Sequence, residues 1–417
     1  MSYLEKLLNG VEVEWKTLGE VAELSNIGVD KKINANEKKV KLLNFVDVFK
    51  NQYISNETPT MVVTASDKKI IDCDIKEGDV FITPSSELID EIGFSAMAIE
   101  DFQNAVYSYH IMRLRINNKD FLFPAFLNYL FSSIAVRKQI RIKAQGITRY
   151  GLTQSSWKSI QIPIPPLSVQ KEIVRILDSF TELTAELTAE LTAELTARKK
   201  QYNYYRDQLL NFDEREVEWK PLGEIFDLKN GYTPSKSNQE YWKDGTIPWF
   251  RMEDIRENGR ILNKSIQYVN SCAVKSGKLF PKNSIIIATS ATIGEHALIT
   301  VPFLSNQRFT NLSLKSKYAN RFLIKFLFYY GFILDEWCKN NTTVGNFAGV
   351  DMNGFKKFLI PIPPLEEQER IISILDKFDT LTTSISEGLP KEIELRKKQY
   401  EYYRDMLLSF PKDNLKA

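Results

Sequence analysis

Two long blocks of this sequence occur twice, and this repetition constrains the fold more than any other feature. IPIPPLSVQKEIVRILDSF (162–180) returns as IPIPPLEEQERIISILDKF (360–378), and RKKQYNYYRDQLLNF (198–212) returns as RKKQYEYYRDMLLSF (396–410). The distance between the two copies is the same for both blocks. Repeats at a fixed distance indicate two copies of one structural unit within the chain.

A third, shorter block marks the start of each copy. VEWKTLGE (13–20) returns as VEWKPLGE (217–224), so both halves have the order VEWK, IPIPPL, RKKQY. The stretches between VEWK and IPIPPL share almost no identity. LLNGVEVEWK near the start also resembles LLNFDEREVEWK after the first RKKQY block. The start of the chain therefore looks like the end of a repeat, which predicts a circular organisation with pseudo-twofold symmetry.

Each IPIPPL block predicts a long helix after it. Its prolines exclude a helix interior, and apolar residues then follow at the i, i+3, i+4, i+7 spacing of a helix. No Pro or Gly interrupts 168–212, which allows a single helix, whereas Gly388 and Pro390 predict a break or kink in the second copy. The apolar stripe consists of Ile173, Ile176, Leu177, Phe180, Tyr202 and Tyr205 in the first copy and Ile371, Ile374, Leu375 and Phe378 in the second.

The first of these helices contains three identical TAEL units in a row. Four residues are close to one helical turn, and the glutamates stack at i, i+4, which is unfavourable for helix stability. The chain length from Leu167 to Arg198 equals that from Leu365 to Arg396, although the sequences between them differ. We therefore expect length to be the property that matters, with two helices of matched length packed antiparallel. The alternative, a functionless repeat, gives no reason for the match.

The two variable segments, 13–161 and 217–359, mix strands and helices in the same order. Their buried strands are predicted at DVFIT and SIIIAT, and their apolar helices at FLFPAFLNYLF and RFLIKFLFYYGF. A polar, turn-rich loop follows each apolar helix. We therefore predict an α+β fold in which two similar α/β domains are joined by two long antiparallel helices that form a coiled coil.

Side chains suited to reading DNA gather in the polar loops. Two stretches without any acidic residue, 121–171 and 296–334, attract phosphate, although a solvated helix face is the alternative. Arg, Lys, Asn, Gln, Ser and Thr are the side chains that contact base edges, and ordinary polar surface is the alternative for each of them. The candidates are Lys143, Gln145, Thr148, Arg149 and Tyr150 in the first segment. In the second they are Tyr232, Thr233, Ser235, Lys236, Asn306, Gln307, Arg308, Asn340, Thr342 and Asn346.

The residue combinations that carry catalysis are missing from the sequence. There is no P-loop, no GxGxxG after a strand, and no Asn-Pro-Pro-aromatic tetrapeptide of the kind that holds a flipped base. The chain has 2 histidines and 3 cysteines that lie far apart, which suits a reducing compartment. It has no signal-peptide pattern and no apolar run long enough to cross a bilayer. We expect a cytoplasmic, non-catalytic protein without a metal site.

Taken together, the blocks resemble the specificity subunit of type I restriction–modification systems. The resemblance covers essentially the whole chain. It rests on two dissimilar segments, each closed by IPIPPL and followed by ILD and RKKQY, and on the TAEL spacer. It implies target recognition domains at 1–161 and 213–359, a central conserved helix at 162–212 and a C-terminal conserved helix at 360–417. Each domain would read one part of a bipartite, asymmetric DNA site.

The resemblance also implies partners. The two conserved helices would dock two modification subunits through the apolar stripe of both copies. Those subunits would bind S-adenosylmethionine and methylate adenine, and restriction subunits would join them for translocation and cleavage with ATP and Mg²⁺. No cofactor is expected in this chain itself.

Two other functions are weighed against this one. A structural coiled-coil adaptor that joins two protein-binding heads would not bind duplex DNA, whereas binding led by phosphate contacts weakens steeply as salt rises. A self-sufficient nuclease or methyltransferase would show turnover by itself, and the missing motifs argue against it.

Overall fold

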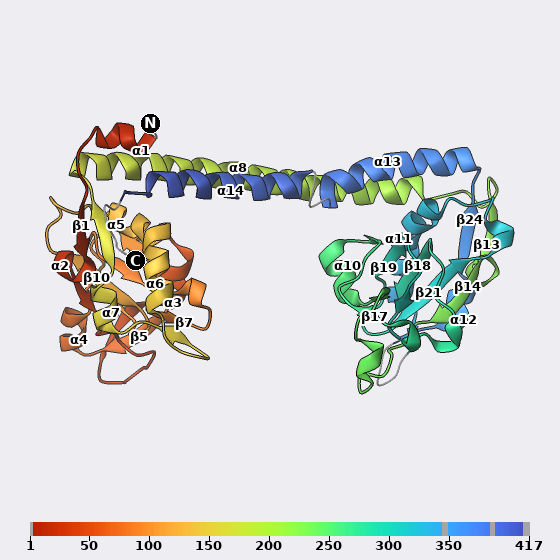
Figure 1. Cartoon of the computed structure of the whole chain (residues 1–417), viewed down its shortest axis with the longest axis horizontal. Coiled ribbons are helices and arrows are strands. Elements are labelled where there is room, and N and C mark those ends of the chain that lie inside the picture. Colours follow the sequence, from red (N-terminus) through yellow and green to blue (C-terminus); the bar gives the residue numbers. More distant parts are fainter. Residues whose placement is uncertain (1–2, 344–348, 384–387, 412–417) are drawn as a thin grey trace. The chain divides into compact units, whose positions relative to one another are not determined.

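The computed structural model describes residues 3–343, 349–383 and 388–411. The chain forms two compact units, of which the first is Met1–Thr188 with Leu395–Ala417 and the second is Ala189–Glu394 (Figure 1). Each unit contains one variable segment. We call residues 13–161 head 1 and residues 217–359 head 2.

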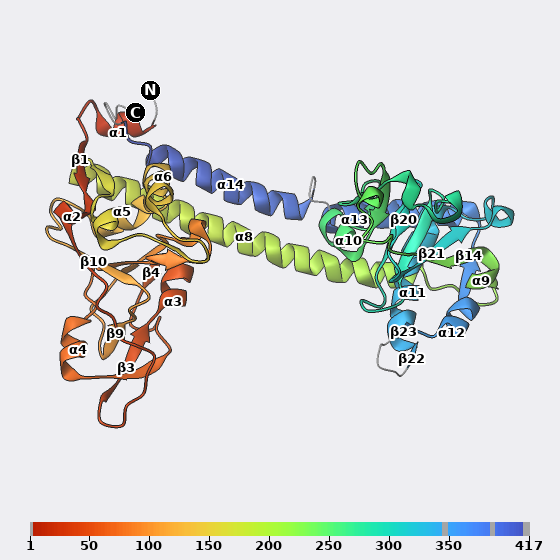
Figure 2. The ribbon, with the colours of Figure 1, turned by 60° about the horizontal axis from the view of Figure 1, so that its bottom comes forward.

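Head 1 is built on a five-stranded sheet with the order β2–β10–β6–β8–β4. Its neighbouring strands are antiparallel, except for the edge strand β4, which is parallel to β8. A three-stranded sheet, β5–β3–β9, lies on the side of the head away from α8 (Leu167–Leu209) (Figure 2). The strands are β2 (Ala22–Ser25), β3 (Lys38–Leu43), β4 (Tyr53–Ile54), β5 (Val62–Ala65), β6 (Val80–Ile82), β8 (Ser95–Ala98), β9 (Ala105–Tyr107) and β10 (Met112–Ile116). The helices are α2 (Leu18–Val21), α3 (Phe45–Lys50), α4 (Asp67–Asp72), α5 (Pro124–Leu130), α6 (Ile134–Lys143) and α7 (Gln154–Lys158), and β7 (Ser85–Ser86) pairs with β11 (Tyr150–Gly151).

Head 2 repeats this topology. Its five-stranded sheet has the order β14–β21–β18–β19–β16, again with one parallel edge strand, and its three-stranded sheet is β17–β15–β20. The strands are β14 (Phe226–Asn230), β15 (Ile247–Phe250), β16 (Ile261–Leu262), β17 (Tyr268–Val269), β18 (Ser284–Ala288), β19 (His296–Ile299), β20 (Leu304–Ser305) and β21 (Phe309–Leu314). The helices are α9 (Leu222–Ile225), α10 (Met252–Asn258), α11 (Ile324–Asn340) and α12 (Met352–Lys357), and β22 (Thr342–Thr343) pairs with β23 (Gly349–Val350). The prediction of two domains with one fold is confirmed.

The middle strand of each five-stranded sheet is the strand predicted from an apolar run. β6 comes from DVFIT and β18 from SIIIAT, and every residue of both strands is buried. β-branched and aromatic side chains fill a strand that is covered on both faces, which explains the unbroken apolar pattern. The two apolar helices are also present, and Pro124 starts α5 because its fixed φ suits the first helical position.

The repeated blocks meet at the base of each head. β1 (Glu14–Thr17) from VEWK pairs antiparallel with β12 (Gln161–Ile164) from IPIP. β13 (Glu218–Pro221) pairs in the same register with β24 (Leu359–Ile362). Two variable segments are therefore closed by the same two-stranded ladder.

The long helices differ between the two copies as the sequence predicts. α8 is one helix of 43 residues that passes through the TAEL units. The second copy forms α13 (Leu365–Thr383) and α14 (Leu389–Leu407), so 360–417 is not one long helix. Gly388 has φ +84°, and a Cβ there would lie 2.6 Å from the carbonyl oxygen of Thr380. A residue with a side chain does not fit this position, and α14 begins at the next residue.

Within the first unit, α8 and α14 pack antiparallel. The ring of Phe180 lies 5.7 Å from that of Tyr403, and Thr181 donates a hydrogen bond to the Tyr400 hydroxyl at 3.0 Å. None of the residues in the TAEL units is fully buried, and Leu187 and Leu191 are half-buried. The tract therefore adds helix length without taking part in either core.

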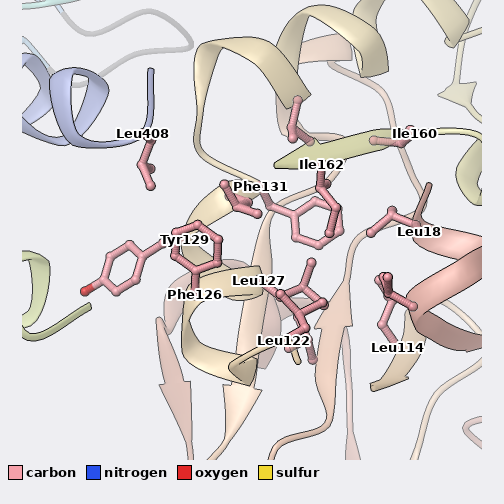
Figure 3. Packing of buried hydrophobic residues seen from close by; sticks show 14 of the residues in the cluster. Leu18, Leu114, Leu122, Phe126, Leu127, Tyr129, Phe131, Ile160, Ile162 and Leu408 are labelled. Atoms are coloured by element: carbon pink, nitrogen blue, oxygen red, sulfur yellow. The ribbon is translucent and has the colours of Figure 1, made fainter. Parts of the chain in front are cut away.

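The core of the first unit joins the head to both ends of the described chain. Leu18, Leu114, Phe126, Phe131 and Ile162 form its centre (Figure 3). Leu4 and Leu8 of α1 (Tyr3–Leu8) belong to the same cluster as Leu407, Leu408 and Phe410, and the Trp15 Nε1–H donates to the carbonyl of Pro411 at 3.3 Å. The early and late segments therefore share one core, as the predicted circular organisation requires.

Candidate nucleic-acid interface

In head 1 the candidate residues lie on one loop that follows α6. Lys143 ends α6, and the backbone of Gln145 exchanges two hydrogen bonds of 2.9 Å with Gly151, which closes the loop. Tyr150 lies opposite Ser86 in the β11–β7 pair. Thr148 is exposed at the tip, beside Ile147, whose side chain is 92% exposed among the described residues.

The conformation of this loop is fixed by its backbone. Gly146 has φ +132°, and a Cβ there would lie 2.0 Å from the carbonyl oxygen of Arg149. The Arg149 side chain donates from Nε to the Ser85 hydroxyl at 3.1 Å. The loop is thus held against β7 through its backbone and through Arg149.

In head 2 five candidate residues meet around one cavity of about 260 Å³. They are Thr233, Lys236, Asn306, Gln307 and Arg308. Trp249, Arg251 and Glu253 complete the lining, and the sequence reading missed these three. The signal for them was present in IPWFRMEDI, where a tryptophan, an arginine and an acid alternate at the end of a strand.

Three segments far apart in sequence form this cavity, and a glycine lets two of them approach. The Gly231 amide donates to the Phe309 carbonyl at 2.9 Å, and the Tyr232 amide donates to the Ser305 carbonyl at 2.8 Å. A Cβ on Gly231 would lie 2.2 Å from the carbonyl oxygen of Asn306. The Thr233 hydroxyl then reaches the side-chain oxygen of Gln307.

The charged wall of the cavity comes from α10 and the turn before β21. The Arg251 guanidinium lies 5.6 Å from the centre of the Trp249 ring and 3.8 Å from the Glu253 carboxylate. The Asn306 side chain accepts a hydrogen bond from the Arg308 amide at 3.0 Å, which sets the turn. Cationic, amide and carboxylate groups therefore share one concave surface.

Two other candidates of head 2 do not line the cavity. The Tyr232 hydroxyl donates to the Ala273 carbonyl at 3.1 Å and accepts from the Lys275 amide at 2.9 Å, so it stabilises a neighbouring turn. The Ser235 hydroxyl lies 2.7 Å from that of Ser237. Tyr232 and Ser235 therefore lie outside the cavity that Arg308 lines.

Two of the remaining candidates lie at the end of α11 and in β22. Thr342 is exposed in β22, and Asn340 donates to the Glu336 carbonyl at 3.0 Å, while Asn346 lies outside the described residues. Thr289 links the β22–β23 hairpin to the cavity, because its amide donates to the Arg308 carbonyl and its carbonyl accepts from the Val350 amide.

The candidate loops occupy equivalent places in the two heads. Val80 in β6 lies opposite Met97, the third residue of β8. In the same way, Ile285 in β18 lies opposite Leu298, the third residue of β19. In head 1 the loop pairs through Gly151 with Ser85, and in head 2 the hairpin bridges through Gly349 to Ser290. In both heads the polar loop therefore returns to the segment that follows the middle strand.

The predicted docking stripe is partly internal. Ile173, Leu177, Tyr202, Ile371 and Leu375 are buried in the chain's own cores. Burial also raises the pKa of the Tyr202 hydroxyl well above its ordinary value. This corrects the expectation that they contact a partner, because helix periodicity identifies an apolar stripe but not what covers it.

Other members of the stripe and their neighbours remain accessible. Ile176, Phe180, Ile374 and Phe378 are half-buried, and Tyr205 is 42% exposed. Ile176 and Phe180 line an apolar cavity of about 330 Å³ with Tyr3, Leu4, Tyr403, Met406 and Leu407.

The tyrosine pairs of the RKKQY blocks have the same exposure in both copies. Tyr204 and Tyr402 are each 62% exposed, while Tyr205 and Tyr403 are 42% and 41% exposed. The two rings of each pair lie 5.5 Å apart and meet edge to face. Exposed aromatic rings of this kind are enriched at protein interfaces.

Within the described ranges, no group of three or more His, Cys, Asp or Glu side chains is arranged to hold a metal ion. A search of the same residues finds no helix with the length and apolar content needed to cross a membrane.

Comparison with known proteins gives a consistent result. The family model of the type I restriction modification DNA specificity domain matches residues 10–197 and 214–395. The EcoR124I/EcoR124II specificity subunit of Escherichia coli is 41% identical over 99% of this chain and 98% of that protein. A putative specificity subunit of Haemophilus influenzae is 35% identical over 98% of both chains. The EcoprrI specificity subunit of Escherichia coli is 61% identical over 51% of this chain, a match that spans about half of that protein, 54%.

Solved structures show the same fold. A chain from a structure on assembly and conformational transition of the type I R-M system superposes with a TM-score of 0.70, at 17% identity and 95% coverage of this chain. The HsdS subunit from Thermoanaerobacter tengcongensis superposes with a TM-score of 0.56, at 18% identity and 96% coverage of both chains.

Proposed function

The chain belongs to the family of type I restriction–modification specificity subunits, and on this premise we propose that it is the non-catalytic DNA-recognition subunit of such a complex. Each head reads one part of a bipartite, asymmetric DNA site. The observation that supports this proposal best is the combination of one topology with two different polar loops at equivalent places. A shared scaffold with divergent loops is what two related readers of different sequences require.

The side chains at the two sites have the chemistry of base recognition. Arg and Lys pair with guanine, Asn and Gln pair with adenine, and Glu accepts from cytosine. The cavity of head 2 presents Arg308, Gln307, Asn306 and Glu253 together. Head 1 presents Gln145, Thr148 and Arg149 on its loop. Exposed lysines of the first acid-free stretch, such as Lys138 and Lys158, contact phosphates, which position the protein without reading sequence.

The TAEL units set the gap between the two half-sites. One unit adds ~6 Å of helix at ~1.5 Å per residue, and one base pair rises ~3.4 Å. One unit therefore corresponds to about one or two base pairs. The half-buried or exposed state of these residues supports a role for their number rather than for their side chains.

The exposed tyrosine pairs dock two copies of one modification subunit. Tyr204 and Tyr402 have equal exposure and equivalent positions in the repeat, so a partner that fits one pair fits the other. In this proposal the modification subunits bind S-adenosylmethionine and methylate adenine, and restriction subunits use ATP and Mg²⁺. The chain itself binds no cofactor, and it acts in the cytoplasm.

Mapping of methylated adenines tests this function. The chain is expressed with the modification subunits of its own system in a host without adenine methylation. We expect one motif with two defined parts and a gap. Exchange of head 2 for that of a relative is expected to change one part only. Methylation without a defined motif, or a change in both parts, would contradict the proposal.

A further inference from the structure

A glutamine at the equivalent position of each long-helix repeat binds the backbone of its head. In head 1 the Gln170 Oε1 accepts from the Phe123 amide at 2.8 Å, and its Nε2 donates to the carbonyls of Phe121 at 3.0 Å and Pro165 at 2.7 Å. Gln170 is 0% exposed. This side chain thus ties the start of α8 to the segment that leads into α5.

The second copy repeats this arrangement. The Gln368 Oε1 accepts from the Leu323 amide at 2.8 Å, and its Nε2 donates to the carbonyls of Arg321 at 2.8 Å and Pro363 at 2.9 Å. Gln368 is also 0% exposed. Both glutamines bind only backbone groups, so the contact does not depend on the side chains of the head.

An aspartate about two turns further along each helix makes a second contact with the head. The Asp178 Oδ1 accepts from the hydroxyls of Tyr53 at 2.6 Å and Tyr129 at 2.7 Å. In the other copy Asp376 accepts from the Tyr329 hydroxyl at 2.6 Å and from the Lys325 ammonium at 2.6 Å.

Both copies of this contact use a tyrosine on the apolar helix of the head, Tyr129 in α5 and Tyr329 in α11. Burial raises the pKa of both Tyr129 and Tyr329 far above the ordinary value, so their hydroxyls remain protonated donors. The Tyr129 hydroxyl lies at the edge of the apolar cluster and points away from Phe126 and Leu127 (Figure 3).

We propose that Gln170 with Asp178, and Gln368 with Asp376, are positioning residues that fix the direction of each head on its own helix and so make the gap length selective. We call each set a Gln–Asp clamp. The inference rests on the proposed function. It adds that gap selectivity depends on these two contacts as well as on the number of TAEL units.

The clamp adds a fixed direction to the stability that apolar burial supplies. The surrounding contacts, from Ile173 and Leu177 in the first copy and from Ile371 and Leu375 in the second, already bury the apolar stripe. Apolar burial is non-directional and permits small rotations, whereas each glutamine pairs one backbone amide and two backbone carbonyls. Directional hydrogen bonds at two points along a helix instead select one orientation.

The test uses the complete complex with its modification subunits and a set of DNA duplexes. All duplexes carry both half-sites, with the native gap, a gap one base pair shorter, or a gap one base pair longer. We compare Gln368→Leu with Glu367→Gln, a control at the preceding position, where the half-buried carboxylate pairs with Arg370 on the same helix. Methylation rates and the melting temperature are measured for each complex.

We expect Gln368→Leu to lower the preference for the native gap by about tenfold, which corresponds to ~1.4 kcal/mol. The preference for each half-site sequence stays as in the wild type, and Glu367→Gln behaves as the wild type. Unchanged gap preference in a folded Gln368→Leu complex would overturn the clamp.

Two further outcomes separate the clamp from the proposed function. If the wild-type complex methylates no duplex of the set, the proposed function itself fails. If Gln368→Leu does not fold, Tyr329→Phe decides, because it removes one hydrogen bond to Asp376 and keeps the buried ring. A folded Tyr329→Phe complex with native gap preference would also overturn the proposal.

Discussion

Among single residues, Arg308 gives the most direct test of base reading. It borders the cavity of head 2, and it precedes β21, while Lys317 follows the other end of this strand. We expect Arg308→Ala to lose about 1–3 kcal/mol of discrimination at one base of one half-site. Binding to duplexes that vary each base in turn measures this loss.

Lys317→Ala is the matched control for this prediction. It removes the same charge from an exposed side chain whose contacts are Glu224 and the Tyr318 ring. We expect it to leave the base preference unchanged. An equal loss in both variants would mean that general charge, rather than base contact, explains the effect.

Gly146 gives the corresponding test in head 1. Its φ of +132° and its close approach to Arg149 mean that Gly146→Ala must shift the loop, at a cost of about 1–3 kcal/mol. We expect binding to become insensitive to the half-site of head 1 and to remain sensitive to that of head 2. The second half-site is the internal control, and sensitivity retained for both would contradict the loop assignment.

The single-residue scale is also where the sequence predicts least. Thr233, Lys236 and Arg308 were recognised as polar loop residues, but Trp249, Arg251 and Glu253 were missed. The cavity brings together three segments, 233–236, 249–253 and 306–308, and no local pattern encodes the close approach at Gly231. Burial of Leu177 and Leu375 was missed for the same reason, since the covering residues come from the heads.

At the scale of elements, α8 supplies the test of the gap. Deletion of Thr188–Leu191 removes about one turn, ~6 Å, from the helix. We expect the gap in the methylated motif to shorten by one or two base pairs, with both half-sites unchanged. Methylome sequencing of the deletion strain decides this, and an unaltered gap or altered half-sites would contradict the role of the TAEL units.

Glu190→Lys is the control for this deletion, because it changes a side chain of the TAEL tract and leaves the length of α8 unchanged. It replaces two like-charge pairs, with Glu186 and Glu194, by two attractive pairs at i, i+4. We expect the helix to gain a few tenths of a kcal/mol, seen as a small rise in melting temperature, and the gap to stay the same. A changed gap would show that side chains, and not only length, set the spacing.

Elements are predicted more reliably than sites in this chain. Period-2 and period-3.6 patterns, prolines and glycines act locally, so the two buried middle strands, the uninterrupted α8 and the break at Gly388 all follow from short stretches. The repeated blocks also predict contacts between distant segments, which local patterns cannot do. Identical blocks are expected to pair in the same way, and β1–β12 and β13–β24 do share their register.

At the scale of the whole molecule, the exposed tyrosine pairs predict how many partners bind. We expect Tyr204→Arg and Tyr402→Arg each to remove one modification subunit, and the double variant to remove both, because a charge in an apolar contact is costly. Native mass spectrometry of the complex counts the subunits. Tyr202→Phe, a change at a buried ring, is the control.

The opposite result would be equally clear. Two modification subunits retained by the double variant would place the contact elsewhere on the chain. The half-buried Ile176 and Phe180, which line an apolar cavity with Tyr403 and Met406, would then be the next surface to change.

The shared strand ladder at the base of each head has a genetic consequence. VEWK and IPIP frame both heads with the same pairing, and the glutamine of each clamp binds only backbone. Recombination between genes at these blocks would therefore transplant an intact head onto an intact support. Under the proposed function, one exchanged segment would give the complex a new half-site in a single event.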